Sequence, residues 1–347
     1  MNSTEIIAYL KNYDGADIKL MEVCGTHTAA IFKNGIRSLI SPKIHLIAGP
    51  GCPVCVTPAA YIDKCIDYAK RENHVLVTFG DMIKVPGTCQ SLAQAKGEGA
   101  RVELMFSPVE VVEKAKANPH ITYVIAAVGF ETTIPTYGVA LSEALKDGVK
   151  NLKFITALKT ALPALEWICE NDKDIDGFIC PGHVSVITGS EVYESLAEKY
   201  QKPFVVAGFE GEHLLAVIYD LVRQIVNKRH NVKNLYQNAV KTQGNPKALA
   251  ITEKYFRPGS ATWRGLGQIP DSGMYLQAEY QEYDAGSHGL DQDLELPKSC
   301  RCTEVIVGRI NPVDCPMFGK GCDPIRPYGP CMVSAEGACG IWYRNTQ

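Results

Sequence analysis

The chain has 347 residues, of which 46% are hydrophobic and 21% are charged, as is usual for a globular protein. Its formal net charge of −3 provides no basic footprint, which argues against nucleic acid or an anionic membrane as a partner. No apolar run approaches the roughly 18 residues that a membrane-spanning helix needs. Thirteen cysteines, without a secretory signature at the N-terminus, lead us to expect a cytoplasmic protein whose clustered thiols bind metal or act in redox chemistry.

Strands and helices alternate over the first two thirds of the chain. Each predicted strand is a short apolar run, and a helix-like segment of about ten residues follows most of them. The predicted strands are residues 18–23, 44–48, 74–79, 102–106, 123–128, 152–158, 177–180 and 204–207. This order indicates parallel sheets with right-handed crossovers. Because the strands are too many for one sheet, we predict two Rossmann-like α/β domains, residues 13–130 and 131–235, whose sheets face a cleft.

The composition changes from about Lys241, where prolines, glycines and aromatic residues dominate and the periodicity is poor. The end of the chain is rich in cysteine, with Cys300, Cys302, Cys315, Cys322, Cys331 and Cys339. We therefore predict a third, irregular domain over residues 236–347, with residues 1–12 as an optional part of it. Its core is expected to form around a metal centre.

The spacing of these six cysteines leaves three kinds of site open. It lacks the repeated C-x-x-C knuckles of a zinc ribbon, which weighs against structural zinc without removing it. Iron–sulfur clusters accept wider and less regular spacing. Structural disulfides are the third alternative, and a reducing compartment disfavours them. Spacing alone does not select the ligands.

A second group of thiols lies in the loop Gly49–Pro58, where Cys52 and Cys55 are separated by two residues. The loop follows the strand at 44–48 and precedes a helix-like segment at 59–70, and a helix N-terminus lowers the pKa of a nearby thiol. Such a pair can cycle between dithiol and disulfide, ligate a soft metal, or pack as two small hydrophobic side chains. Because another cysteine and the Cys-rich end accompany the pair, redox chemistry or metal binding is favoured.

Nearly every polar motif follows a predicted strand, and in parallel sheets ligands bind beyond the carboxyl ends of the strands. The residues expected to line one cleft are Cys24, His27, Cys52, Cys55, Asp81, Glu131, His183, Glu210 and His213. Three thiolates meeting there would suit iron(II), copper(I) or zinc. The alternatives are a structural loop histidine at His183 and helix N-terminal acids, favoured by the helix dipole, at Glu131 and Glu210.

Four motifs, in this order, resemble the hydrogenase maturation factor HypD family. They are CGTH at 24–27, GPGCPVC at 49–55, GFETT at 129–133 and PGHVS at 181–185. With the Cys-rich end they extend over almost the whole chain. The resemblance implies two α/β domains and a third domain that holds a [4Fe-4S] cluster.

The resemblance also implies a ligand set for that cluster. The family's pattern, Cys-x14-Cys-x6-Cys-x16-Cys, is matched at every interval by Cys300, Cys315, Cys322 and Cys339. Cys302 and Cys331 are left over, and they are expected to form a redox-active or structural pair near the cluster.

The family is a scaffold on which the Fe(CN)2CO unit of nickel–iron hydrogenases is assembled. It works with the small chaperone HypC and receives cyanide that HypE and HypF supply. By motif, Cys24 would be the main ligand of the iron that carries CN and CO, shared with a cysteine of HypC. Cys52 and Cys55 would be further ligands or a redox dithiol, and His27 would handle protons or hydrogen bonds beside the iron.

Two other functions compete with the scaffold. One is a [4Fe-4S]-dependent thiol–disulfide reductase that uses Cys52 and Cys55, and the other is a zinc-stabilised binding protein. We expect an assembly scaffold with redox activity rather than a conventional turnover enzyme. The sequence contains no Walker-type phosphate loop.

Overall fold

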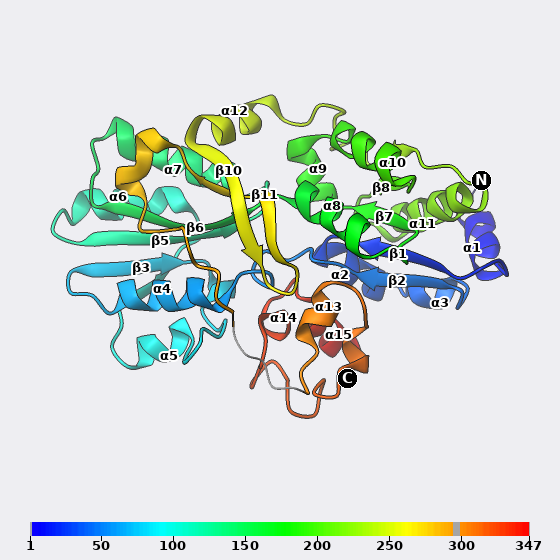
Figure 1. Cartoon of the computed structure of the whole chain (residues 1–347), viewed down its shortest axis with the longest axis horizontal. Helices are drawn as coiled ribbons and strands as arrows, with labels where there is room; N and C mark the ends of the chain where they lie inside the picture. The colour runs from blue at the N-terminus through cyan, green and yellow to red at the C-terminus, as the bar shows by residue number, and fades with distance from the viewer. Residues whose placement is uncertain (1, 294–298, 347) are drawn as a thin grey trace.

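The computed structural model describes residues 2–293 and 299–346. Within these residues the strands form two sheets, which lie toward opposite ends of an elongated molecule (Figure 1). Helices cover both sheets, so the predicted α/β class is confirmed. Every predicted strand overlaps an observed one, because short apolar runs between helices mark buried parallel strands well.

The first sheet is parallel throughout, with the strand order β2-β1-β7-β8-β9. Its strands are β1 (Ile18–Glu22), β2 (Ile44–Ala48), β7 (Gly177–Cys180), β8 (Phe204–Val206) and β9 (Val232–Asn234). The helices around it are α1 (Ser3–Lys11), α2 (Gly25–Lys33), α3 (Ile36–Leu39), α8 (Ala161–Asn171), α9 (Gly182–Thr188), α10 (Glu194–Tyr200) and α11 (Gly211–Val226). Helices α1, α2 and α11 share one apolar core with β1, β2 and β8.

The second sheet is mixed, with the order β10-β11-β6-β5-β3-β4. Its strands are β3 (His74–Thr78), β4 (Val102–Leu104), β5 (Thr122–Gly129), β6 (Leu152–Lys159), β10 (Phe256–Trp263) and β11 (Gly267–Leu276). The helices are α4 (Ala59–Ala69), α5 (Leu92–Gly97), α6 (Pro108–Ala117), α7 (Ile134–Lys146) and α12 (Pro246–Tyr255). Side chains alternate between the two faces: Val75 and Val77 pack with α6 and α7, whereas Leu76 joins the core that contains α4.

The order of strands along the chain differs from their order in space. Strand β1 lies between β2 and β7 and pairs with both, and the chain runs through β3 to β6 of the second sheet before it returns to β7. The ranges 13–130 and 131–235 therefore each contribute strands to both sheets, and a boundary near residue 130 does not separate the sheets. Alternation of strands and helices predicts parallel pairing, but it carries no information about which sheet a crossover enters.

The expectation of an irregular segment from residue 236 onward is wrong for residues 246–276. These residues form α12 and the hairpin β10–β11, which pairs antiparallel with β6 and so ends the all-parallel pattern. Pro258 and Gly259 weaken the strand signal, but β10 is an edge strand with a register shift after Gly259. Proline is tolerated at edges and bulges of this kind.

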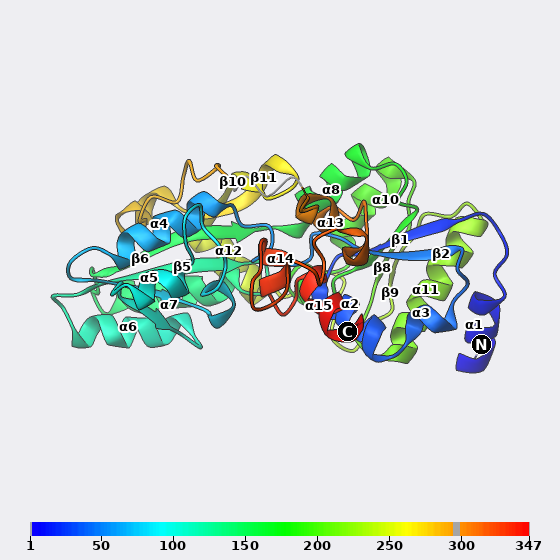
Figure 2. The same cartoon turned by 90° about the horizontal axis from the view of Figure 1, so that it is seen from below.

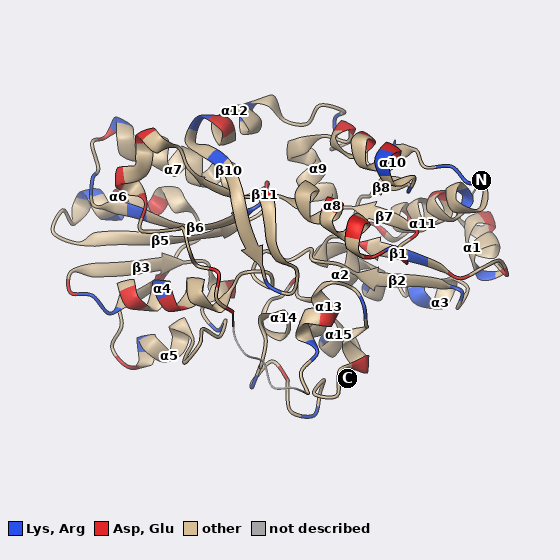
Figure 3. Cartoon of the chain, viewed as in Figure 1, with Lys and Arg blue, Asp and Glu red and all other residues tan. Residues whose placement is uncertain are grey.

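The Cys-rich tail, residues 299–346, packs beneath the hairpin and beside α2 in two perpendicular views (Figures 1 and 2). It contains α13 (Cys302–Ile306), α14 (Pro330–Val333) and α15 (Ala338–Thr346). Its side chains belong to the same apolar core as Met21 in the first sheet and Leu76 in the second. Acidic and basic residues are interspersed along both halves of the molecule (Figure 3).

Candidate thiol site

Two cysteine motifs lie together because their strands are neighbours. Glu22, at the end of β1, pairs with Ala48 at the end of β2, so the loops that follow leave the same edge of the sheet. Gly51 packs so closely against the other loop that a Cβ atom there would lie 2.5 Å from the backbone nitrogen of Cys24. The strand register therefore brings Cys24 next to the loop that carries Cys52 and Cys55.

Cys24 is the N-cap residue of α2 and is 8% exposed. Burial raises the pKa of its thiol to about 11, although hydrogen bonds from the first turn of the helix oppose the shift. The negative charge of Glu336 raises the pKa further. Without a bound metal ion, Cys24 is therefore protonated at neutral pH. An added metal ion would favour its deprotonation.

Cys52 and Cys55 form a buried dithiol. Their sulfurs lie 2.6 Å apart, and Cys52 also contacts the hydroxyl of Ser334 in the tail at 3.3 Å. Both side chains are less than 5% exposed. Burial, followed by hydrogen bonds to Cys331 and Cys52, raises the pKa of Cys55 well above its ordinary value.

The tail cysteines gather around one small cavity. Its lining includes all six of them: Cys300, Cys302, Cys315, Cys322, Cys331 and Cys339. The four thiols assigned to a cluster by the family pattern thus lie in the same place as the two left over. From the sequence we expect these cysteines to gather at one centre, with Cys302 and Cys331 near the other four, and the shared cavity agrees with that expectation.

Cys331 connects the two groups of thiols. Its sulfur accepts a hydrogen bond from the backbone N–H of Cys339 at 3.3 Å, and its side chain lines both the tail cavity and the cavity with Cys52 and Cys55. The neighbouring thiols of Cys302, Cys339 and Cys55 lower the pKa of Cys331 well below its ordinary value, and Cys302 has the largest effect. Cys331 therefore ionises more readily than a free cysteine, and it lies between the dithiol and the tail.

The chemistry of the tail fits a sulfur-ligated metal cluster. Backbone N–H groups of Arg301 and Tyr328 point to the sulfurs of Cys315 and Cys322, each at 3.4 Å, as hydrogen bonds to cluster ligands do. Within the part of the chain that the structure describes, no three His, Cys, Asp or Glu side chains are already arranged as a ligand set. The cysteines are free thiols that lie close to one another. The fit of the tail to a metal cluster therefore depends on the sulfur donors and on their shared location.

His27 is fully buried and joins the CGTH motif to the loop that follows β8. Its Nε2 lies 3.3 Å from the carbonyl oxygen of Ala207, and its ring packs on Phe209 with 4.8 Å between centroids. Burial lowers the pKa of His27 to about 4, so the imidazole is neutral at pH 7. Among the described residues Nδ1 has no hydrogen-bond partner.

Glu336 is a site residue that the sequence analysis missed. Its carboxylate accepts a hydrogen bond from Thr26 at 3.3 Å, and it lines a small cavity with Cys52 and Cys55. Burial raises the pKa of Glu336; the nearby Asp81 raises it further, and His183 lowers it. A single glutamate in a loop between two tail cysteines carries no sequence signal that would have marked it.

The other predicted cleft residues separate into two places. His183 is exposed and packs on Phe209, with 4.2 Å between ring centroids. His213 Nδ1 lies 3.1 Å from Glu210 Oε2 at the start of α11, where the Glu210 side chain is exposed and the His213 side chain is half-buried. Glu131 lies in a different cavity, without a cysteine in its lining.

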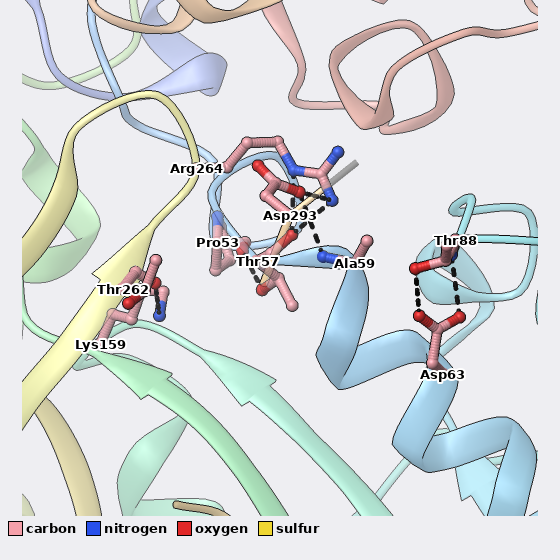
Figure 4. A network of polar contacts seen from close by, with 9 residues as sticks. All are labelled: Pro53, Thr57, Ala59, Asp63, Thr88, Lys159, Thr262, Arg264 and Asp293. Carbon is pink, nitrogen blue, oxygen red and sulfur yellow. Dashed lines mark hydrogen bonds and ion pairs between the residues drawn. The ribbon is translucent and has the colours of Figure 1, made fainter. Parts of the chain in front are cut away.

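The motif loop is also held by Arg264, which the sequence analysis did not single out (Figure 4). Its guanidinium is 1% exposed and donates from Nε and Nη2 to the carbonyl oxygen of Thr57 at 3.1 and 2.9 Å. Nη2 also lies 3.0 Å from Asp293, whose carboxylate accepts a bond from the backbone N–H of Ala59. The hairpin and the start of α4 are thereby fixed to the loop that carries the dithiol.

Comparison with known proteins identifies one family over nearly the whole chain. Residues 2–346 match the HypD family model, described as the hydrogenase formation hypA family. The hydrogenase maturation factor HypD of Rhodobacter capsulatus is 42% identical over 335 residues, which cover 94% of this chain and 89% of that protein. The chain belongs to the HypD family of hydrogenase maturation factors.

Other HypD-family relatives are similar to the same extent. Hydrogenase maturation factor HypD of Escherichia coli K12 is 41% identical over 335 residues, covering 95% of this chain and 90% of that protein. A putative hydrogenase expression/formation protein of Methanocaldococcus jannaschii is 39% identical over 329 residues, covering 94% and 92%. No helix in the described parts of this HypD-family chain has both the length and the apolar character to cross a membrane.

Proposed function

We propose that the protein is the scaffold on which the Fe(CN)2CO precursor of nickel–iron hydrogenases is assembled. The observation that carries this proposal is the meeting of Cys24 with the Cys52–Cys55 dithiol at one edge of the first sheet. Thiolates are suitable ligands for iron(II), the substrate of the assembly. Cys24 would be the principal ligand, with Cys52 and Cys55 as further ligands or as a dithiol.

The tail would supply electrons to this site. Cys300, Cys315, Cys322 and Cys339 would hold a [4Fe-4S] cluster, which provides one-electron chemistry when it is bound. Cys331 lines the tail cavity as well as the cavity with Cys52 and Cys55, and the pKa of its thiol is lowered by neighbouring thiols. This position supports a path for reducing equivalents between tail and dithiol.

Thiol–disulfide exchange along this path balances without another reactant. If Cys52 and Cys55 are a disulfide, the Cys331 thiolate attacks Cys55 and releases Cys52 as a thiolate. Cys302 then attacks Cys331 and releases Cys55. The dithiol is regenerated, and the two electrons come from the pair Cys302 and Cys331, which becomes a disulfide.

We further propose the partners and compartment that this function requires. A HypC-type chaperone would share the iron, with its cysteine beside Cys24. A HypE-type protein would donate cyanide. A reducing cytoplasm would keep the free thiols in the reduced form.

Infrared spectroscopy tests the scaffold. The protein is purified anaerobically after co-expression with the other maturation proteins, as wild type, Cys24→Ala and the control Cys89→Ala, which removes an exposed thiol outside the site. We expect CN and CO stretching bands in the wild type and the control, and none in Cys24→Ala. Bands that survive Cys24→Ala would move the iron to Cys52 and Cys55 or to a partner.

A thiol–disulfide reductase is the second candidate, and the Cys55–Cys331 contact favours it. It predicts turnover of a protein or small disulfide that stops in Cys331→Ser and continues in Cys169→Ser, a buried cysteine outside the path. Absence of CN and CO bands in an intact complex, together with such turnover, would favour the reductase over the scaffold.

A further inference from the structure

A cavity of about 340 Å³ lies between the two sheets, away from the cysteines. It is bounded by the ends of β5 and β6, by α8, α9 and α12, and by the hairpin. This volume is within the range of small-molecule sites, which commonly lie between domains or sheets. The wall is mainly apolar, with Ile134, Leu162, Val184, Ile187, Leu249 and Met274 among its side chains.

Glu131 places one carboxyl group in this apolar wall. The side chain is 8% exposed, and its Oε1 accepts a hydrogen bond from the backbone N–H of Ala161 at 2.7 Å. The other oxygen, Oε2, is buried and has no hydrogen-bond partner within the described residues. A buried carboxylate oxygen without a donor is unfavourable, which points to a donor that comes from outside the chain.

The charges around the cavity select the kind of donor. Its charged lining residues are Glu131 and Asp271, and no lysine, arginine or histidine of the described residues lines it. A phosphate, a nucleotide or a carboxylic acid would meet two carboxyl groups without a compensating cation. Loss of hydration raises the pKa of Glu131 to about 7, as expected for a carboxyl without a basic partner.

We propose that this cavity binds a small organic amine, whose ammonium group donates to Oε2 of Glu131 and whose hydrocarbon body contacts the apolar wall. The site is separate from the thiols and does not depend on the function proposed above. A neutral alcohol of the same size makes the same apolar contacts without the ion pair, and an acid adds repulsion. The ligand order expected is therefore amine, then alcohol, then acid.

Isothermal titration calorimetry and ligand-observed NMR on the full chain test this order. The probes are benzylamine, 2-phenylethylamine and 3-phenylpropylamine, each compared with the matching alcohol and carboxylic acid. We expect at least one amine to bind saturably with Kd of about 0.1–1 mM, and its matching acid to bind at least tenfold more weakly.

Two variants locate the binding. Glu131→Gln should weaken the best amine about tenfold while it leaves the alcohol unchanged, and Glu191→Gln is the matched control, an exposed carboxylate near the cavity but not in its lining. Should Glu131→Gln fold poorly, Leu162→Trp fills the cavity and leaves the carboxyl in place; it should abolish binding of amine and alcohol alike. Absence of saturable binding by all three amines, or equal binding of the acids, would overturn the proposal, as would amine binding that survives Leu162→Trp.

Discussion

His27 is neutral in the folded protein because burial lowers its pKa from 6.5 to about 4. Between these two values the unfolded chain binds more protons than the folded protein. The neutral His27 therefore does not reduce the free energy of unfolding above pH 6.5. As the pH falls from 6.5 to about 4, the free energy of unfolding decreases by about 3 kcal/mol in all. Glu22 and Glu131, whose pKa values burial raises to about 7, contribute with the opposite sign.

Comparison of variants isolates the contribution of His27. In His27→Gln, which retains an N–H donor for the carbonyl oxygen of Ala207, we expect a smaller loss of stability between pH 7 and pH 5 than in the wild type. Urea unfolding at pH 7 and pH 5 measures this loss of stability, and His120→Gln, at an exposed histidine, is the control. An unchanged difference between the two pH values would contradict a buried neutral imidazole.

A second prediction at this scale concerns Glu336, whose charge raises the pKa of Cys24. Removal of that charge in Glu336→Gln should increase the thiolate fraction of Cys24 and speed its alkylation by iodoacetamide at pH 8, roughly twofold to fivefold. Peptide mass spectrometry measures the rate at this cysteine. Glu304→Gln, a change of the same kind in the tail, should have no effect; equal rates in both variants would contradict the prediction.

At the scale of elements, α2 and the tail are in direct backbone contact. A Cβ atom at Gly25 would lie 2.1 Å from the carbonyl oxygen of Glu336, which cannot move without displacing the tail. We expect Gly25→Ala to lower the free energy of unfolding by about 2 kcal/mol. Gly80→Ala, where no atom lies within 4 Å of the new Cβ, is the control for urea unfolding. Equal stabilities would mean that the tail does not rest on α2.

Arg264 joins the hairpin to the motif loop, and lysine does not reproduce its two bonds to the carbonyl oxygen of Thr57. In Arg264→Lys we expect the free energy of unfolding to decrease by about 2–3 kcal/mol. This decrease is smaller than for a fully buried ion pair, because the Asp293 side chain is 30% exposed. We also expect faster alkylation of Cys52. Arg257→Lys, at an exposed position of β10, the strand that precedes Arg264, is the matched control. A loss no larger than in that control would show that the clamp is dispensable.

The elements that sequence reasoning found share a local signal. Strands β1, β2 and β7 are apolar runs followed by glycine- or cysteine-containing motifs, so their carboxyl ends and the site next to them are predictable. The hairpin β10–β11 lacks such a signal, because Pro258 and Gly259 interrupt the pattern of β10 and are tolerated there only because β10 is the edge strand. Arg264 and Glu336 act through contacts with residues far away in the chain, and single charged residues in loops do not reveal such contacts.

At the scale of the whole molecule, the second sheet requires residues from beyond the predicted boundary at 235. A chain that ends at residue 240 lacks the hairpin and leaves the edge of β6 uncovered. We expect it to lose the near-ultraviolet circular dichroism of the native protein. A chain that ends at residue 293 retains the hairpin and should keep more of this signal. Equal spectra for the two fragments would show that the sheet is complete without the hairpin.

The interleaved strand order also determines which parts of the two sheets can form first during synthesis of the chain. Lys19 bonds to Asp176, 157 residues later, whereas β3 to β6 lie within one continuous segment of the chain. At translation rates of about 5–20 residues per second, β1 waits roughly 10–30 seconds for its partner β7. The core strands of the second sheet can pair during that interval. Although the cysteine motifs and the paired strands β1 and β2 that bring them together are made first, the strands from β7 onward and the tail that packs against the motifs are therefore among the last parts of the newborn protein to be added.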